Sequence, residues 1–227
     1  MVATLYGVGV GPGDPELMTV KAWRLIAGAT TIAYLCANGG ESTALEIARP
    51  FLPDQFEAIA IDMPMKVERG PAKAAYDKGA ARIAAILAQG QDVIFLCEGD
   101  PFFYGSFMYL FERLHKTHRI KIVPGVTSIT AAAAELGQPL AERDQVLKIL
   151  PATLDAEELR AELKTVERAA IIKVGRHFAK VKAILKEHAL EGTVISYATH
   201  AKQKVYELSE IEADTLPYFT TIIVRRK

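Results

Sequence analysis

The sequence predicts an α/β protein with two domains, and two observations carry this prediction. Up to about residue 118, short apolar runs alternate with longer amphipathic or alanine-rich segments, which is typical of a parallel sheet with helices on its faces. Further along, strands follow one another at shorter spacing with fewer helices between them, which indicates a mixed α+β sheet. The length of 227 residues suits one large or two small domains. We therefore predict an N-terminal α/β domain at residues 1–118 and a C-terminal α+β domain at 119–227.

The elements of the first domain follow from local signals. Asp14 is the predicted N-cap of the first helix, with Pro15 as its first residue and Glu16 in its first turn. The long alanine-rich helix is expected to end near Gly90. In chain order we predict strands at 5–10, 30–36, 57–63 and 92–97, and helices at 15–29, 42–51, 71–90 and through 109–115.

The second domain begins with a strand at 119–126, which leads through PGVTS into the alanine-rich segment 127–137. Its remaining strands are apolar and rich in β-branched residues, and two charged amphipathic segments between them are helical. We predict these strands at 146–152, 169–175, 193–198, 203–208 and 218–226, with helices at 156–164 and 177–188.

Composition limits the class of protein. Lysine plus arginine and aspartate plus glutamate each number 27, and this neutral balance argues against a nucleic-acid-binding protein. Cys36 and Cys97 both lie in apolar runs, which favours buried reduced thiols and a cytoplasmic location. No apolar run approaches the 18 residues of a membrane span. We expect a cytoplasmic protein that contacts no membrane.

The glycine-rich stretch GVGVGPGD begins within the first predicted strand and continues beyond its end, with glycines at positions 7, 9, 11 and 13. It matches neither the G-x-G-x-x-G dinucleotide fingerprint nor the P-loop, which ends in Gly-Lys-Ser/Thr. Asp14 would also repel a phosphate from the start of the helix. Glycines in a strand otherwise allow another backbone to pack close. The loop is therefore interpreted as a site of close approach to something other than phosphate.

Two further loops rich in glycine and proline are expected near it, CEGDPFFYGS and VPGVTS. Ligands of open α/β sheets bind beyond the carboxyl ends of the strands, where such loops lie. In KVGRHFAKVKAILK, Lys173, Arg176 and His177 lie at a strand end before a helix, where Arg176 suits recognition of carboxylates and His177 is a candidate general base. The alternatives are a routine Asp-Pro turn in the second loop and a solvated helix-start histidine. For Lys180, Lys182 and Lys186 we expect only a solvated helix face.

Five stretches of the sequence together resemble those of a known protein family. GVGVGPGDPELMT, LCEGDPFFYGSFMYL, VPGVTS, KVGRH and PYFTTIIV occur in this order and span the chain. Together they resemble the tetrapyrrole (class III) S-adenosylmethionine-dependent methyltransferases of cobalamin and siroheme synthesis. EGDPFFYGSFMYL, and MPM before the alanine-rich helix, resemble the members that methylate precorrin-2 at C-20 to give precorrin-3A. One departure is Ser196-Tyr197, where the family pattern has an acidic-basic pair before Ala198-Thr199.

The resemblance implies that S-adenosyl-L-methionine, or its product S-adenosyl-L-homocysteine, binds in an active-site cleft between the two domains. Carried over position by position, the cofactor contacts are Pro12, Glu98, Gly99, Asp100, Phe103, Thr127, Ser128, Ile129, Val174, Ala198 and Thr199. The expected substrate contacts are Gly13, Asp14, Lys173, Arg176 and His177, with Lys66 and Arg69 as further partners for the carboxylates of the tetrapyrrole.

The implied chemistry is displacement at the sulfonium methyl by an electron-rich ring carbon, so positioning is the main contribution of the protein. No catalytic side chain is named, no metal site is expected in the protein, and the resemblance implies a homodimer. The alternatives are a cobalt-containing form of the same substrate, another ring carbon, a protein or RNA substrate, and a binding module without catalysis. Conversion of labelled S-adenosylmethionine would separate an enzyme from a binding module.

Overall fold

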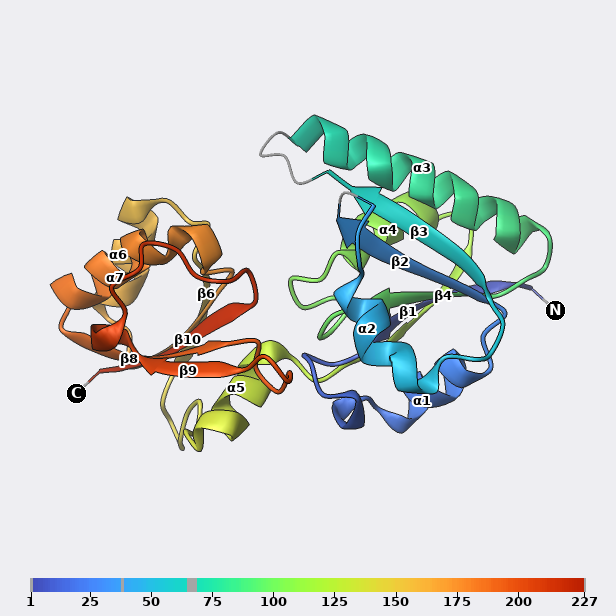
Figure 1. The fold of residues 1–227 in the computed structure, drawn as a ribbon. Helices are drawn as coiled ribbons and strands as arrows, with labels where there is room; N and C mark the ends of the chain where they lie inside the picture. Colours follow the sequence, from blue (N-terminus) through green and yellow to red (C-terminus); the bar gives the residue numbers. More distant parts are fainter. Residues whose placement is uncertain (1, 38, 65–68, 227) are drawn as a thin grey trace. The chain divides into compact units, whose positions relative to one another are not determined.

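The computed structural model describes residues 2–37, 39–64 and 69–226, and for residue 69 the backbone only. The chain divides into two compact units, Met1–Thr127 and Ser128–Lys227, each with a five-stranded sheet (Figure 1). The division falls nine residues later than the predicted boundary at 118–119. The reason is that strand β5 (Arg119–Val123) pairs with β1 (Thr4–Gly9) and so belongs to the first sheet.

The first sheet is parallel throughout, in the order β3-β2-β4-β1-β5, as the alternating pattern predicts. Its other strands are β2 (Thr31–Ala37), β3 (Glu57–Met63) and β4 (Val93–Cys97). Its helices are α1 (Val20–Ala27), α2 (Thr43–Ala48), α3 (Arg69–Ala88) and α4 (Phe107–Leu114). One buried cluster joins the sheet to α3 and α4 and another joins it to α1 and α2, so helices cover both faces (Figure 1).

The helix predicted at 15–29 is divided in two. Asp14 caps a short 3₁₀ turn at Pro15–Leu17, where its Oδ1 accepts from the Glu16 N–H at 2.8 Å. The α-helix α1 begins only at Val20, because Thr19 is extended and its hydroxyl accepts from the Ala22 N–H at 3.2 Å. The capping function predicted for Asp14 is confirmed, and Thr19 provides a second cap that the sequence reading missed.

The second sheet is mixed, in the order β6-β7-β10-β8-β9. Its strands are β6 (Leu147–Pro151), β7 (Arg168–Ile172), β8 (Leu190–Ser196), β9 (Lys204–Glu207) and β10 (Thr220–Arg226). Because β10 pairs antiparallel with both β7 and β8, those two strands run in the same direction. Their carboxyl ends therefore lie at the same edge of the sheet.

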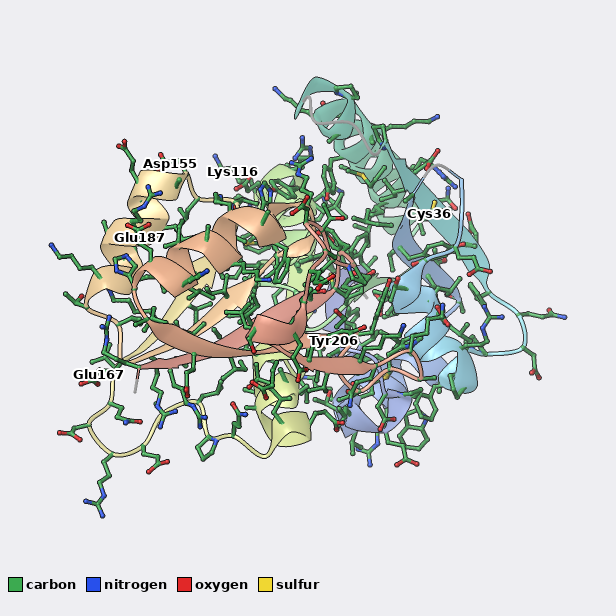
Figure 2. All side chains as sticks on the ribbon, turned by 60° about the vertical axis from the view of Figure 1, so that its left-hand side comes forward. Cys36, Lys116, Asp155, Glu167, Glu187 and Tyr206 are labelled. Atoms are coloured by element: carbon green, nitrogen blue, oxygen red, sulfur yellow. The ribbon has the colours of Figure 1, made fainter. Side chains whose placement is uncertain are left out.

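The helices of the second unit are α5 (Ser128–Leu136), α6 (Ala156–Lys164) and α7 (Phe178–Glu187). One core cluster joins α6 and α7 to the sheet, and α5 covers the opposite face (Figure 1). Asp155 caps α6, and Arg160 on this helix contacts Glu187 on α7 at 2.8 Å (Figure 2). Among the described residues, no helix is long and apolar enough to cross a membrane.

Candidate functional site

Three glycines at the carboxyl ends of neighbouring strands pack backbone against backbone in the first unit. Gly9 ends β1, Gly99 follows β4, and Gly125 follows β5. A Cβ atom on Gly125 would lie 2.0 Å from the Gly99 carbonyl oxygen, and one on Gly9 would lie 2.5 Å from the same atom. Only glycine permits these approaches. The predicted convergence of the glycine-rich loop, CEGDPFFYGS and VPGVTS is therefore found, and each loop is in contact with another.

Hydrogen bonds fix this junction. Gly11 and Gly99 form an antiparallel bridge, in which the Gly99 N–H donates to the Gly11 carbonyl at 2.8 Å. The Val10 N–H donates to the Cys97 carbonyl at 2.9 Å. Gly11 and Gly99 have φ angles of +84° and +62°, a left-handed conformation that disfavours other residues. The loops after β1 and β4 are thus joined as a small extension of the sheet.

Asp100 connects the loop after β4 to the loop after β5. Its Oδ1 accepts from the N–H groups of Phe102 and Phe103 at 2.8 and 3.0 Å. Its Oδ2 accepts from the Gly125 N–H at 3.0 Å. Three backbone donors on one carboxylate make Asp100 an organiser of the junction. The resemblance proposes Asp100 as a cofactor contact, and its side chain serves first to hold both loops.

Glu98 lies between the end of β4 and Gly99. The pKa of its carboxyl group is raised, because the effect of burial exceeds the opposite effect of hydrogen bonds from its own N–H and from the Ala44 N–H. Ala44 lies in the first turn of α2, so the carboxylate connects the end of β4 to that helix. Burial also raises the pKa of Cys97, and both cysteines are free and buried as predicted.

The remaining candidates of the first unit lie in the same three loops. Phe103 is half-buried, with its ring 5.2 Å from that of Tyr104, which has a φ of +53°. Pro12 and Asp14 are half-buried, Gly13 is buried, and Asp14 is engaged in its cap. Thr127, also half-buried, ends the loop after β5.

In the second unit, the candidates after β7 and β8 lie at one edge of the sheet. Lys173 follows β7 with a φ of +56°, and Tyr197 and Thr199 follow β8 with φ of +55° and +66°. Non-glycine residues in this conformation are uncommon and concentrate at binding sites, because the surrounding structure must hold them there. Val174 and Ala198 are buried beside them.

Lys173, Arg176 and His177 give this edge its charge. Burial lowers the pKa of Lys173. The Arg176 Nε donates to His177 Nε2 at 3.3 Å, which requires an unprotonated Nε2. Burial, with the positive charges of Lys180 and Arg176, lowers the pKa of His177, in agreement with that bond. Arg176 itself is exposed.

The expectation of a solvated face for Lys180 and Lys182 is wrong. The Lys180 Nζ donates to the Ala152 carbonyl at 2.7 Å and also to the Leu154 carbonyl. The Lys182 Nζ donates to the Ile211 carbonyl. Both side chains are half-buried because they cross from α7 to neighbouring loops, whereas Lys186 is exposed as predicted.

Ser196 and Tyr197, which depart from the family pattern, both bond to residues 219–220 at the start of β10. The Ser196 hydroxyl is buried and lies 2.7 Å from the Thr220 hydroxyl on β10, and the Thr220 hydroxyl also lies 2.8 Å from the Pro217 carbonyl. The Tyr197 N–H donates to the Phe219 carbonyl at 2.7 Å. A neutral hydroxyl pair thus joins β8 to β10 at this position.

The remaining candidates lie elsewhere in the chain. Ser128 and Ile129 begin α5, with Ile129 buried. Lys66 lies outside the described residues, and only the backbone of Arg69 is described. In the first unit the structure joins the three loops that carry candidates, and in the second it places the candidates after β7 and β8 at one edge of the sheet. The cleft expected between the domains stays a prediction. Sequence reasoning missed Gln203 and Glu135, because neither residue belongs to a recognisable motif. The Gln203 side chain bonds both to the turn after β8 and to Glu135.

Comparison with known proteins gives the family. The family described as Tetrapyrrole (Corrin/Porphyrin) Methylases matches residues 4–213. The cobalamin biosynthesis protein CobIJ of Mycobacterium bovis is 40% identical over 96% of this chain, which spans only 45% of that protein. The precorrin-2 C(20)-methyltransferase of Sinorhizobium sp. is 34% identical over 98% of this chain and 95% of its own length.

Solved structures agree in fold. A cobalt precorrin-4 methyltransferase superimposes with a TM-score of 0.75 at 22% identity, covering 98% of this chain and 94% of its own. The uroporphyrin-III C-methyltransferase of Thermus thermophilus, in complex with S-adenosylhomocysteine, has a TM-score of 0.73 at 20% identity, covering 98% of this chain and 97% of its own. With the match over residues 4–213, these findings show that the chain belongs to the tetrapyrrole (corrin/porphyrin) methylases.

Proposed function

We propose that this protein is an S-adenosylmethionine-dependent methyltransferase that methylates precorrin-2 at C-20, giving precorrin-3A in cobalamin biosynthesis. The observation that carries the proposal is the similarity over nearly the full length of both chains to the Sinorhizobium precorrin-2 C(20)-methyltransferase. A cobalt-precorrin-2 C(20)-methyltransferase of Salmonella typhimurium is also 34% identical, over all of this chain and 98% of its own. The presence of cobalt in the substrate is therefore part of the test.

The residues present fit S-adenosylmethionine. The first unit offers the half-buried loop backbone of Gly99 and Gly125 and the half-buried ring of Phe103, which suit a flat purine. Hydroxyl groups of Thr127, Ser128 and Thr199 are of the kind that bind ribose and amino acid groups. When bound, the cofactor supplies a sulfonium methyl group that a ring carbon of the substrate attacks, with S-adenosylhomocysteine as the second product.

The chain contributes position rather than a reacting group. The loops after β1, β4 and β5 are fixed to one another by Asp100 and by the Gly11–Gly99 bridge, so their backbone groups are preorganised. In the second unit, Arg176 and Lys173 supply positive charge for the carboxylates on the rim of the substrate. Gly13 and Asp14 are the proposed substrate contacts of the glycine-rich loop.

A direct assay tests this function. The protein is incubated with labelled S-adenosylmethionine and either precorrin-2 or cobalt-precorrin-2, and S-adenosylhomocysteine is measured. Formation of S-adenosylhomocysteine only with a tetrapyrrole present supports the proposal, and the faster of the two substrates is the preferred one. Binding without turnover of either would identify a binding module.

We further propose a cytoplasmic homodimer, as the family resemblance implies. The free, buried Cys36 and Cys97 suit a reducing compartment. Light scattering at micromolar concentration should give twice the mass of 24.8 kDa, and a monomer across that range would contradict the dimer.

A further inference from the structure

The turn between β8 and β9 is held in an unfavourable backbone conformation. Tyr197 and Thr199 are both left-handed, and for the β-branched Thr199 a φ of +66° is a genuine outlier. Within the turn, the His200 N–H donates to the Tyr197 carbonyl at 2.9 Å and the Gln203 N–H donates to the His200 carbonyl at 2.8 Å. The turn then leads into β9, which carries Tyr206 (Figure 2). Such a conformation persists only where neighbouring groups hold it.

The side chain of Gln203 is one group that holds Thr199 in this conformation. Its Oε1 accepts from the Thr199 N–H at 2.5 Å, and its Nε2 donates to Glu135 Oε2 at 2.7 Å. A reversed amide would place its NH₂ group against the Thr199 N–H and its oxygen against the carboxylate, which leaves both bonds unmade. The carboxylate of Glu135 therefore determines which way the amide faces, and it makes this bond charge-assisted.

This arrangement connects two segments that sequence reasoning assigned to the cofactor. Glu135 lies in the last turn of α5, the helix that begins with Ser128 and Ile129. Ala198 and Thr199 lie in the turn at the other end of the contact. Because α5 packs against β10, the helix is a fixed reference for the turn.

We propose that Gln203 is a positioning residue for the cofactor, which holds the Ala198–Thr199 backbone against α5 by bridging Thr199 and Glu135. The inference rests on the proposed function, because the turn is assigned to S-adenosylmethionine there. Loss of the bridge lets Thr199 relax to a right-handed or extended conformation and reorients the neighbouring peptide groups. Cofactor affinity then falls while the sheet and helices stay folded.

The test measures S-adenosylhomocysteine affinity by calorimetry and melting temperature on the full chain. Gln203→Ala and Glu135→Ala should each weaken binding about tenfold, equivalent to about 1.4 kcal/mol. The double variant should lose no more than Gln203→Ala alone, since both changes break one bridge. Glu135→Gln keeps an acceptor oxygen and should bind within about twofold of wild type. Lys202→Ala, an exposed residue of the same turn, is the matched control.

A relief experiment separates positioning from general stability. Thr199→Gly removes the penalty of the left-handed conformation, so adding Gln203→Ala to it should cost clearly less than tenfold in affinity. Wild-type affinity in Gln203→Ala overturns the inference, as does a tenfold loss that Thr199→Gly leaves unchanged. If the wild-type protein does not bind S-adenosylhomocysteine, the proposed function itself fails, and the inference with it.

Discussion

Substituting Gly125 by alanine tests the glycine junction most severely. The new Cβ would lie 2.0 Å from the Gly99 carbonyl oxygen and 2.9 Å from the Gly9 Cα. Real Cβ atoms essentially never approach within 3.0 Å, so backbone must move. Overpacking costs about 1–3 kcal/mol where side chains can rotate aside, and these neighbours cannot.

The movement also weakens the bond from the Gly125 N–H to Asp100, and a bond to a charged group is worth about 1.5–3 kcal/mol. We therefore expect the free energy of unfolding to fall by about 3 kcal/mol or more, which is about 6–12 °C in melting temperature for a chain of this size. Calorimetry should also show S-adenosylhomocysteine binding weakened at least tenfold.

Two matched variants distinguish the clash from backbone strain. Gly99→Ala places its Cβ 3.8 Å from the Val126 carbonyl oxygen, which is ordinary contact, so only its φ of +62° is costly, by about 1 kcal/mol. Gly90→Ala, with a φ of +81° and no neighbour within 4 Å, carries the same strain away from the junction. Equal melting temperatures and equal affinities for Gly125→Ala and Gly90→Ala would show that no clash occurs at Gly125.

Three further predictions concern charged groups. Arg176→Ala should raise the KM for the tetrapyrrole about 10- to 100-fold, because one charge-assisted pair is lost, and should leave S-adenosylhomocysteine affinity unchanged. Lys164→Ala, at an exposed residue, is the control. Weakened cofactor binding in Arg176→Ala would contradict the assignment of Arg176 to the substrate. His177 should titrate below 6.5 by NMR, and Arg176→Ala should raise its pKa, because one of the positive charges that lower it is removed. Because the pKa of His177 is lower in the folded protein, the unfolded chain binds a proton at this residue first as the pH falls below about 6.5. The free energy of unfolding should therefore decline with falling pH, and His177→Gln should abolish the part of the decline that is due to this residue. Asp100→Ala loses all three hydrogen bonds from backbone N–H groups and should lower the free energy of unfolding by about 2–4 kcal/mol. Asp100→Asn keeps one acceptor oxygen and should lower it less. Equal losses for the two variants in chemical denaturation would argue against the acceptor role of Asp100.

The strands and their order along the chain could be predicted because apolar runs and glycine or proline boundaries are local signals. The division at residue 127 could not, because a strand such as β5 does not show which sheet it joins. That choice depends on pairing with β1, a contact more than a hundred residues away in sequence.

The candidate site was predictable where it depends on glycine. The close approach at Gly9 is a property of the residue type, although the sequence could not show that Gly99 and Gly125 are its neighbours. The partners of Lys180 and Lys182 were missed, because a lysine on a helix face reads as solvated until its carbonyl acceptors are placed.

We propose that this chain transfers the methyl group of S-adenosylmethionine to C-20 of precorrin-2. The most direct measurement uses S-adenosylmethionine carrying a ¹³C-labelled methyl group, with the purified protein and precorrin-2, and locates the label in the product by NMR. We expect one labelled methyl at C-20 for each S-adenosylhomocysteine formed. Label at another ring carbon, or S-adenosylhomocysteine formed without a labelled tetrapyrrole, would contradict it.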